Sequence, residues 1–391
     1  MFITRIGQLL TMEGAALGLR SNVSLRVENG RVAEIIDGEV SRHGDAIDAG
    51  GQLVTPGLVD PHTHLIFAGS RADEFDRRAR GQSYNEIAAA GGGILSTVRA
   101  TRAASDEELI ASTLARLDRF LRNGVVAVEA KSGYALSIEG ELRLLRLLKR
   151  VAQQHVVKIS PTLLAHVPPP DLPRQVFVDR FIAEAIPQAA QEKLAEAVDV
   201  YCDVGAFTLD ETERILNAAK SLGLRLRVHA EQFTYTGAAE LAAKLGAASV
   251  EHLEELSADG PALLARSQTV CNLLPGAALT LGLKWPNARA LLDAGCLVAL
   301  GTDCNPGSSL TESLPLMMSL ACMQMKMSCE EAWRAATVNA ARALGHDLGR
   351  VAVGASANLV IWRANDYREV IQHYGDSLVE AVIVDGQKMQ F

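Results

Sequence analysis

Short apolar runs rich in β-branched residues alternate with amphipathic helical segments from about residue 55 to residue 345. Eight runs follow this pattern, at residues 58–65, 125–134, 156–166, 197–205, 224–233, 248–256, 268–276 and 296–307. Apolar runs bounded by helices are typical of parallel strands that are covered on both faces. Eight such strands over roughly 290 residues predict an α/β fold of the (β/α)8 TIM-barrel type.

The starts of three helices are marked by capping boxes, in which a Ser or Thr is followed three residues later by Glu. The pairs are Ser105 with Glu108, Thr208 with Glu211, and Ser328 with Glu331. A doubly wound open sheet is the alternative fold. It would usually carry GxGxxG after its first strand, and none follows the first run here.

The two ends of the chain have a different pattern. Both contain short strand-like segments, with turn signals at Asn29-Gly30 and Asp37-Gly38 near the start. Neither end has enough residues for a core of its own. We therefore expect residues 1–55 plus 346–391 to form one small composite β-sandwich-like domain, beside a catalytic barrel over 56–345.

Charge and composition limit the possible partners. The chain has 38 basic and 46 acidic residues, a net charge of −8, which argues against broad binding to nucleic acid or to an anionic membrane. The sequence predicts no signal peptide or membrane span, and its six cysteines include no CxxC pair. We expect a cytoplasmic protein with reduced thiols that acts on a small molecule.

Histidine and aspartate residues recur at the predicted strand ends. His62 and His64 end the first strand two residues apart, so their rings can face one ion. His229 ends the fifth strand, His252 lies within the sixth, and Asp303 ends the eighth. Because active sites of such barrels lie at the carboxyl ends of the strands, the pattern predicts one metal site with ligands His62, His64, His229 and Asp303.

Each of these residues has an ordinary structural explanation when taken alone. An HxH pair can occur by chance, His229 could be a core histidine, and His252 or Asp303 could cap a helix. Their joint occurrence at successive strand ends is what favours a metal site. Three imidazoles and one carboxylate suit zinc or iron, and such an ion lowers the pKa of bound water from about 15.7 towards 7.

Two further roles follow from this hypothesis. His252 would orient the water or stabilise the developing oxyanion, and Asp303 would carry a proton to the leaving nitrogen. Lys131 ends the second strand, which is the wrong strand for a lysine that bridges two metals. We therefore expect one metal ion and a structural or solvent-facing Lys131.

The chain resembles the mononuclear branch of the amidohydrolase superfamily. The resemblance rests on PGLVDPHTHLIFAGSRADEF (56–75), EAKSGYAL (129–136), HAEQF (229–233), EHLEEL (251–256), GTDCNPGSS (301–309) and ATVNAARALG (336–345). The combination of FAGSRADEF with AAAGGGILSTVRATR (88–102) is specific to one group of cyclic amide hydrolases within that superfamily. The resemblance covers nearly the whole chain and implies a homodimer.

This narrower resemblance implies hydrolysis of 4-imidazolone-5-propanoate to N-formimidoyl-L-glutamate, a step of histidine degradation. Arg71 would bind the propanoate carboxylate with two parallel hydrogen bonds; the alternative is a surface salt bridge to Asp73 or Glu74. The other residues that the resemblance assigns to substrate are Tyr84, Tyr134, His166, Gln232, Asn305, Gly307 and Ser308. The Gly91–Gly93 run has no assigned role.

Gln232 departs from a glutamate that the family can carry three residues after the histidine of this strand. Glutamine can orient a ring nitrogen but cannot carry a proton at neutral pH. Proton transfer would then fall to Asp303 and His252. The competing functions are a deaminase with the same ligands, which would release ammonia, and a non-catalytic barrel, which would usually have lost ligands.

Overall fold

The computed structural model describes residues 1–40, 46–82, 86–87 and 91–390. Within them, eight parallel strands form one sheet in which each strand pairs with the next along the chain. These strands are β6 (Leu58–Asp60), β7 (Val125–Lys131), β8 (Lys158–Ala165), β9 (Ala197–Cys202), β10 (Arg225–Ala230), β11 (Ser249–His252), β12 (Val270–Leu273) and β13 (Val298–Leu300). All eight fall inside the predicted runs.

The sheet closes into a barrel just beyond the ends of its first and last strands. Thr63 forms a parallel bridge with Cys304, and the Asp303 N–H donates to the His62 carbonyl at 3.1 Å. The closing hydrogen bonds therefore involve the same short segments that carry three of the four predicted metal ligands.

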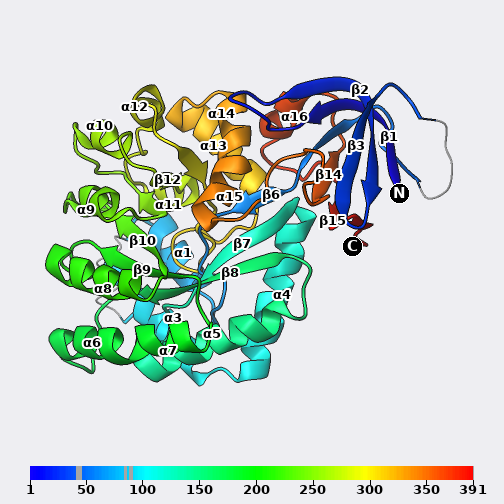
Figure 1. Ribbon diagram of the computed structural model, residues 1–391. Coiled ribbons are helices and arrows are strands. Elements are labelled where there is room, and N and C mark those ends of the chain that lie inside the picture. Colours follow the sequence, from blue (N-terminus) through cyan, green and yellow to red (C-terminus); the bar gives the residue numbers. More distant parts are fainter. Residues whose placement is uncertain (41–45, 83–85, 88–90, 391) are drawn as a thin grey trace.

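Helices surround the barrel (Figure 1). All three predicted capping boxes are formed, with Ser105, Thr208 and Ser328 as the N-caps of α4, α8 and α14. The helices are α1 (Ala72–Ala79), α3 (Ile94–Ala103), α4 (Asp106–Arg122), α5 (Ile138–Ala152), α6 (Arg174–Arg180), the π-helix η1 (Phe181–Ala185), α7 (Ile186–Gln191), α8 (Leu209–Ser221), α9 (Ala238–Leu245), α10 (Gly260–Leu264), α11 (Pro275–Leu281), α12 (Ala288–Asp293), α13 (Leu314–Met325), α14 (Cys329–Ala335), α15 (Val338–Leu344) and α16 (Tyr367–Gln372).

The chain ends together form a second, mixed sheet beside the barrel (Figure 1). Its strands are β1 (Phe2–Leu10), β2 (Leu19–Glu28), β3 (Arg31–Asp37), β4 (Ala46–Asp48), β5 (Leu53–Pro56), β14 (Leu359–Trp362), β15 (Val379–Val384) and β16 (Gln387–Lys388). The two ends meet where β14 pairs antiparallel with β5, and the Trp362 indole N–H donates to Thr55 Oγ1 at 2.8 Å. The predicted barrel with a β unit built from both termini is confirmed. The precise division of the chain at 55/56 and 345/346 stays a prediction.

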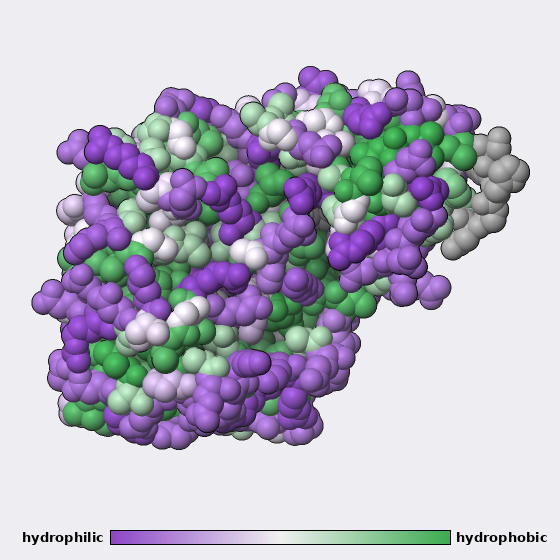
Figure 2. Space-filling view, viewed as in Figure 1, coloured by the Kyte–Doolittle hydropathy of each residue, from purple (hydrophilic) through white to green (hydrophobic). Residues whose placement is uncertain are grey.

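Hydrophilic residues cover most of the barrel surface on the face shown in Figure 2. None of the described helices combines the length and the apolar character needed to cross a bilayer. The apolar side chains are instead concentrated between the barrel and its helices, with a second core inside the terminal sheet. This arrangement leaves the carboxyl ends of the barrel strands as the place where polar side chains are buried together.

Candidate metal centre and substrate pocket

Four predicted metal ligands come together at the carboxyl end of the barrel. His62 and His64 directly follow β6, His229 lies in β10, and Asp303 follows β13. The Nε2 atoms of His64 and His229 are 3.3 Å apart. Asp303 Oδ1 lies 3.4 Å from His64 Nε2 and 3.5 Å from His62 Nε2. Ligands bound at about 2.1 Å in a tetrahedral site are about 3.4 Å from one another, so these separations fit one ion.

The opposite nitrogens of two rings are bound to buried carboxylates. His62 Nδ1 lies 3.0 Å from Glu251 Oε2, and His229 Nδ1 lies 3.0 Å from Asp199 Oδ1. A carboxylate at Nδ1 places the proton there and leaves the lone pair on Nε2, facing the cluster. His62 Nε2 is buried and has no hydrogen-bond partner among the described residues. Such a lone pair, directed at other donor atoms, fits a metal ligand.

The charges around the rings also favour a cation. Burial lowers the pKa of His62 and His64 well below the ordinary value, and it lowers the pKa of His229 to about 4. The rings are therefore neutral, as metal ligands must be. Burial raises the pKa of Asp303 to about 6. A bound metal ion would reverse this effect by stabilising the carboxylate.

Lys131 is fully buried beneath the cluster. Its Nζ donates to Glu129 Oε1 at 2.8 Å and to Asp199 Oδ2 at 2.7 Å. Burial would raise the pKa of Asp199, but its interactions with His229 and Lys131 outweigh this effect and hold that pKa well below the usual range. Lys131 is thus a structural residue that holds the carboxylate behind His229. One lysine between two carboxylates also leaves negative charge for a cation to balance.

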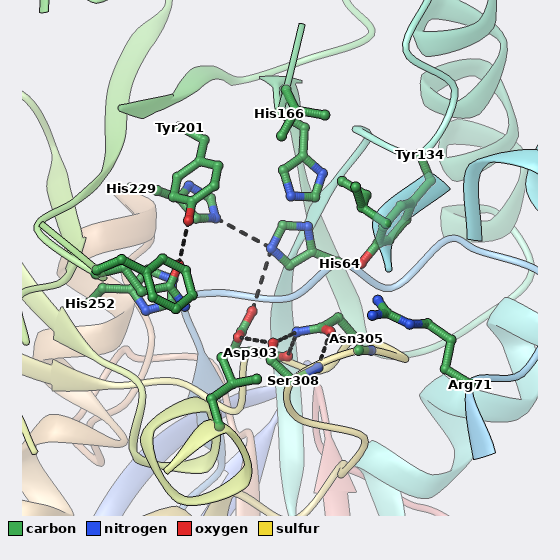
Figure 3. Close-up of a pocket in the computed structure, with 16 residues that line it drawn as sticks. His64, Arg71, Tyr134, His166, Tyr201, His229, His252, Asp303, Asn305 and Ser308 are labelled. Atoms are coloured by element: carbon green, nitrogen blue, oxygen red, sulfur yellow. Dashed lines mark hydrogen bonds and ion pairs between the residues drawn. The ribbon is translucent and has the colours of Figure 1, made fainter. Parts of the chain in front are cut away.

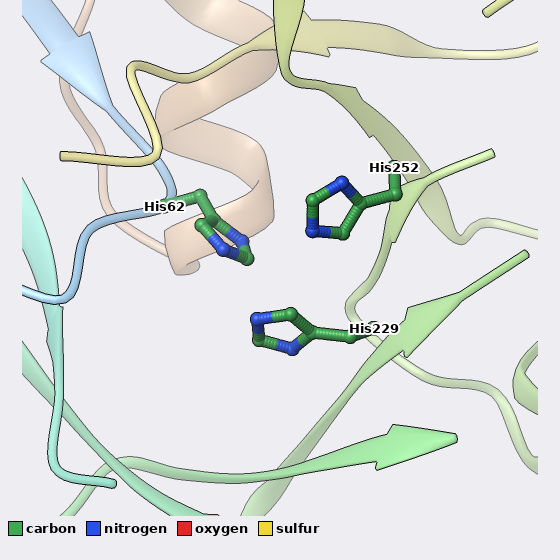
Figure 4. A group of neighbouring side chains, drawn as sticks. All are labelled: His62, His229 and His252. Carbon is green, nitrogen blue, oxygen red and sulfur yellow. The ribbon is translucent and has the colours of Figure 1, made fainter. Parts of the chain in front are cut away.

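His252 lies at the end of β11 and turns its ring toward His62 and His229 (Figure 4). One ring nitrogen of each of these three histidines lies within 4.8 Å of the others. Burial lowers the pKa of His252, but the Glu254 carboxylate more than offsets this, and the pKa is raised. His252 is therefore next to the four-residue cluster, with the ability to hold a proton there.

A pocket of about 110 Å³ opens beside the cluster (Figure 3). The predicted residues that line it are His64, Arg71, Tyr134, His166, Gln232, Asn305, Gly307 and Ser308, together with His229, His252 and Asp303. Tyr84, the remaining predicted substrate residue, lies outside the described residues. The structure therefore brings the other predicted substrate residues to one pocket, and of the four predicted metal ligands only the fully buried His62 does not line it.

Arg71 is buried at the N-terminus of α1 and forms the salt bridge to Glu74 that was considered as its alternative, but in the interior and not at the surface. Its Nε and Nη2 donate to Glu74 Oε2 at 2.9 and 2.7 Å, and the side chain also lines the pocket. The other Glu74 oxygen accepts from the Gly93 N–H at 3.0 Å. A Cβ at Gly307 would lie 2.2 Å from Arg71 Nη1, so only glycine allows the guanidinium to lie against this backbone.

The loop after Asp303 is held by its own hydrogen bonds. Asn305 Oδ1 accepts from the Gly307 and Ser308 N–H groups, each at 2.8 Å, and Asn305 Nδ2 donates to the Asp303 carbonyl at 2.7 Å. The Ser308 hydroxyl donates to Asp303 Oδ2 at 3.2 Å. This network keeps the loop at the end of the pocket where Arg71 lies.

Two further side chains present oriented polar groups to the pocket. His166 Nδ1 lies 3.0 Å from the Gly133 carbonyl, and the ring stacks on that of His64 with centroids 5.2 Å apart. Burial lowers the pKa of His166 to about 3, so this ring is neutral, and with Nδ1 donating, Nε2 is an acceptor. The Tyr201 hydroxyl donates to Gln232 Oε1 at 2.9 Å, which leaves the Gln232 amide N–H groups as donors.

Tyr201, Asp199 and Glu251 were not predicted from the sequence as site residues. The signal that could have found the two carboxylates is a charged residue inside an otherwise apolar barrel strand, because such a charge must be paired when buried. Tyr201 lies opposite His229 in the register of β9 and β10. Only the strand order and register bring it next to Gln232.

Comparison with known proteins agrees with this geometry. The model of the amidohydrolase family matches residues 53–389. Among solved structures, a 5-methylcytosine deaminase from Klebsiella pneumoniae superposes with a TM-score of 0.81 at 18% identity, over 100% of this chain and 98% of that one. A mutant atrazine chlorohydrolase from Arthrobacter aurescens, complexed with zinc and atraton, superposes with a TM-score of 0.76 at 17% identity, over 99% of this chain and 94% of that one. At these identities the two structures show a shared fold.

The chain belongs to the amidohydrolase family, a class of metal-dependent hydrolases. Its curated relatives include an imidazolonepropionase of Geobacillus kaustophilus, 44% identical over 99% of this chain and 97% of that protein. Another imidazolonepropionase, from Rubrobacter xylanophilus, is 46% identical over 97% of this chain and 94% of that protein.

Proposed function

We propose that the chain hydrolyses 4-imidazolone-5-propanoate to N-formimidoyl-L-glutamate in histidine degradation. The observation that carries the proposal is the position of Arg71, which lines the same pocket as the ring nitrogens of His64 and His229. A pocket with candidate metal ligands beside it and a guanidinium among its lining residues suits a small cyclic amide that bears a carboxylate tail. The full-length similarity to imidazolonepropionases supports the same substrate.

We assign one metal ion, zinc or iron, to His62, His64, His229 and Asp303. Such an ion would supply a Lewis acid for the ring carbonyl and would lower the pKa of water towards about 7. Water adds to the carbonyl carbon, and the ring C–N bond breaks. The new carboxylate keeps the oxygen of water, and the leaving nitrogen takes a proton.

The protein's own residues position the substrate and move the proton. Asp303 accepts the proton of water at Oδ2, where the Ser308 hydroxyl lies 3.2 Å away, and passes it to the leaving nitrogen. His252 orients the attacking water, which donates a hydrogen bond to its Nε2. Gln232 donates through its amide N–H groups and carries no proton, because Tyr201 holds its oxygen. Arg71, with Asn305, Gly307 and Ser308, binds the carboxylates of substrate and product, and Tyr134 and His166 contact the ring.

The test is to incubate the purified, metal-assayed protein with freshly generated 4-imidazolone-5-propanoate. We expect the ultraviolet absorbance of the ring to fall much faster than in buffer, with N-formimidoylglutamate as the product by mass spectrometry. Release of ammonia would instead indicate a deaminase. Loss of absorbance at the buffer rate, with metal bound, would contradict the proposed substrate. The predicted homodimer is tested separately, by sedimentation of the same preparation.

A further inference from the structure

Glu254 is a buried carboxylate that the proposed mechanism does not use. It follows β11, two residues after His252, and is 2% exposed. Neither of its carboxylate oxygens has a hydrogen-bond partner among the described residues. An ion buried without partners lowers the stability of the folded state. Because burial of Glu254 does not stabilise the fold, we looked for a functional role of its carboxylate.

The group that forms an ion pair with this carboxylate is the ring of His252. Glu254 Oε1 lies 3.6 Å from His252 Nδ1, and this nitrogen likewise has no hydrogen-bond partner in the described part of the chain. The other ring nitrogen, Nε2, then lies on the opposite side of the imidazole, toward the pocket that His252 lines. The order is carboxylate, imidazole and pocket, the arrangement by which a carboxylate sets the tautomer of a catalytic histidine.

The backbone that produces this pairing is strained. His252 has a φ of 76° and Leu253 a φ of 73°, so two consecutive residues with side chains adopt the left-handed region. Such conformations cost free energy and persist only where surrounding structure enforces them. In a regular strand, the side chains of residues 252 and 254 would point to the same face and extend side by side. Here, the turn brings the carboxylate to the ring.

Glu254 also lines a second cavity, of about 180 Å³, whose other lining residues include Ser257, Lys284 and Asn287. None of the residues that line this cavity lines the substrate pocket. Glu254 thus lies between this cavity on one side and the His252 imidazole on the other.

We propose that Glu254 is a positioning residue that holds His252 with Nδ1 protonated and Nε2 directed at the substrate. The expected fall in kcat rests on the proposed function, whereas the position of the proton on the His252 ring rests on geometry alone. It does not place Glu254 in contact with substrate or metal.

The test compares Glu254→Leu, Glu254→Gln and the neighbouring Glu255→Leu. Glu255 reaches the surface and pairs with Lys284 at 3.4 Å, so it serves as the matched control. We expect Glu254→Leu to lower kcat about 10- to 100-fold with KM nearly unchanged and the metal content intact. Glu254→Gln should recover part of the loss, because its amide oxygen still accepts from Nδ1. In the absence of Glu254, removing His252 should cost little more, so the two effects should not multiply.

Stability and the ring itself give readouts that a merely structural role would not produce. The midpoint of unfolding should change little in Glu254→Leu, because leucine replaces a buried carboxylate whose ionic partner, His252 Nδ1, lies 3.6 Å away. In ¹⁵N-histidine NMR, the His252 ring signals should shift in Glu254→Leu and not in Glu255→Leu. This result does not depend on the substrate, so it stands apart from a failure of the proposed function. A wild-type kcat in Glu254→Leu, or unchanged His252 ring signals, would overturn the inference.

Discussion

The two halves of the pocket are held in place by different means. In the metal half, the proposed metal ligands lie at the ends of barrel strands, and buried carboxylates bind the far nitrogens of His62 and His229. In the substrate half, Arg71 and the loop from Asn305 to Ser308 are held by short-range contacts between loops and the start of α1. The first half is fixed by the barrel, and the second can vary with loop sequence. This difference suggests that the metal half provides the chemistry of the family and the substrate half provides specificity.

Removal of a metal ligand is expected to have the largest effect. His229→Ala removes one of the three converging imidazoles and leaves Asp199 without its ring partner. We expect turnover to fall about 1,000-fold or more, since both metal affinity and the geometry of the water are lost. Metal content by atomic emission and turnover should fall together. A variant that binds no metal and keeps its rate would show that the metal half is not the site of chemistry.

Removal of Arg71 tests the substrate half. Arg71→Met should lower kcat/KM about 100-fold, because a charge-assisted interaction with the propanoate is worth up to about 3 kcal/mol. Metal content should stay normal. Arg80→Met, at the exposed C-terminal end of the same helix, is the control. An equal fall in kcat/KM in the two variants would show that the substitutions act through the folding of α1 and not through substrate binding.

Asp199→Asn is a milder change in the metal half. It keeps a hydrogen-bond acceptor for His229 but removes the charge that pairs with Lys131. We expect metal affinity to weaken about tenfold or more, as measured by competition with a chelator. Glu196→Gln, at the other end of β9, should bind metal like the wild type. An unchanged affinity in Asp199→Asn would show that the ring is held by the barrel alone.

The smallest effect is expected for Tyr201→Phe. It removes the hydroxyl that holds Gln232 Oε1, a neutral hydrogen bond worth about 1 kcal/mol, so kcat/KM should fall about fivefold. The exposed Tyr235→Phe provides a comparison in the same region. A loss above about 100-fold would give Tyr201 a direct role in the reaction, which the present assignment does not include.

The two halves of the site were predicted from the sequence by different means, the metal half from strand ends and the substrate half from the family resemblance. His62, His64, His229 and Asp303 are recognisable because strand ends of a barrel converge, so position along the chain gives position in space. The contacts of Asp199 and Glu251 with the histidine rings depend on which strands are neighbours, which the sequence pattern does not give. The pairing of Arg71 with Glu74 and its packing on Gly307 depend on loop conformation, which no periodic pattern encodes.

The most direct test of the central claim is to strip the protein of metal and return it in known amounts. The assay is the ring-opening of 4-imidazolone-5-propanoate, with N-formimidoylglutamate identified as the product. One ion bound by His62, His64, His229 and Asp303 predicts no turnover in the stripped protein and a linear recovery that saturates at one equivalent of metal per chain. Recovery that requires two equivalents, or full turnover without metal, would contradict this account.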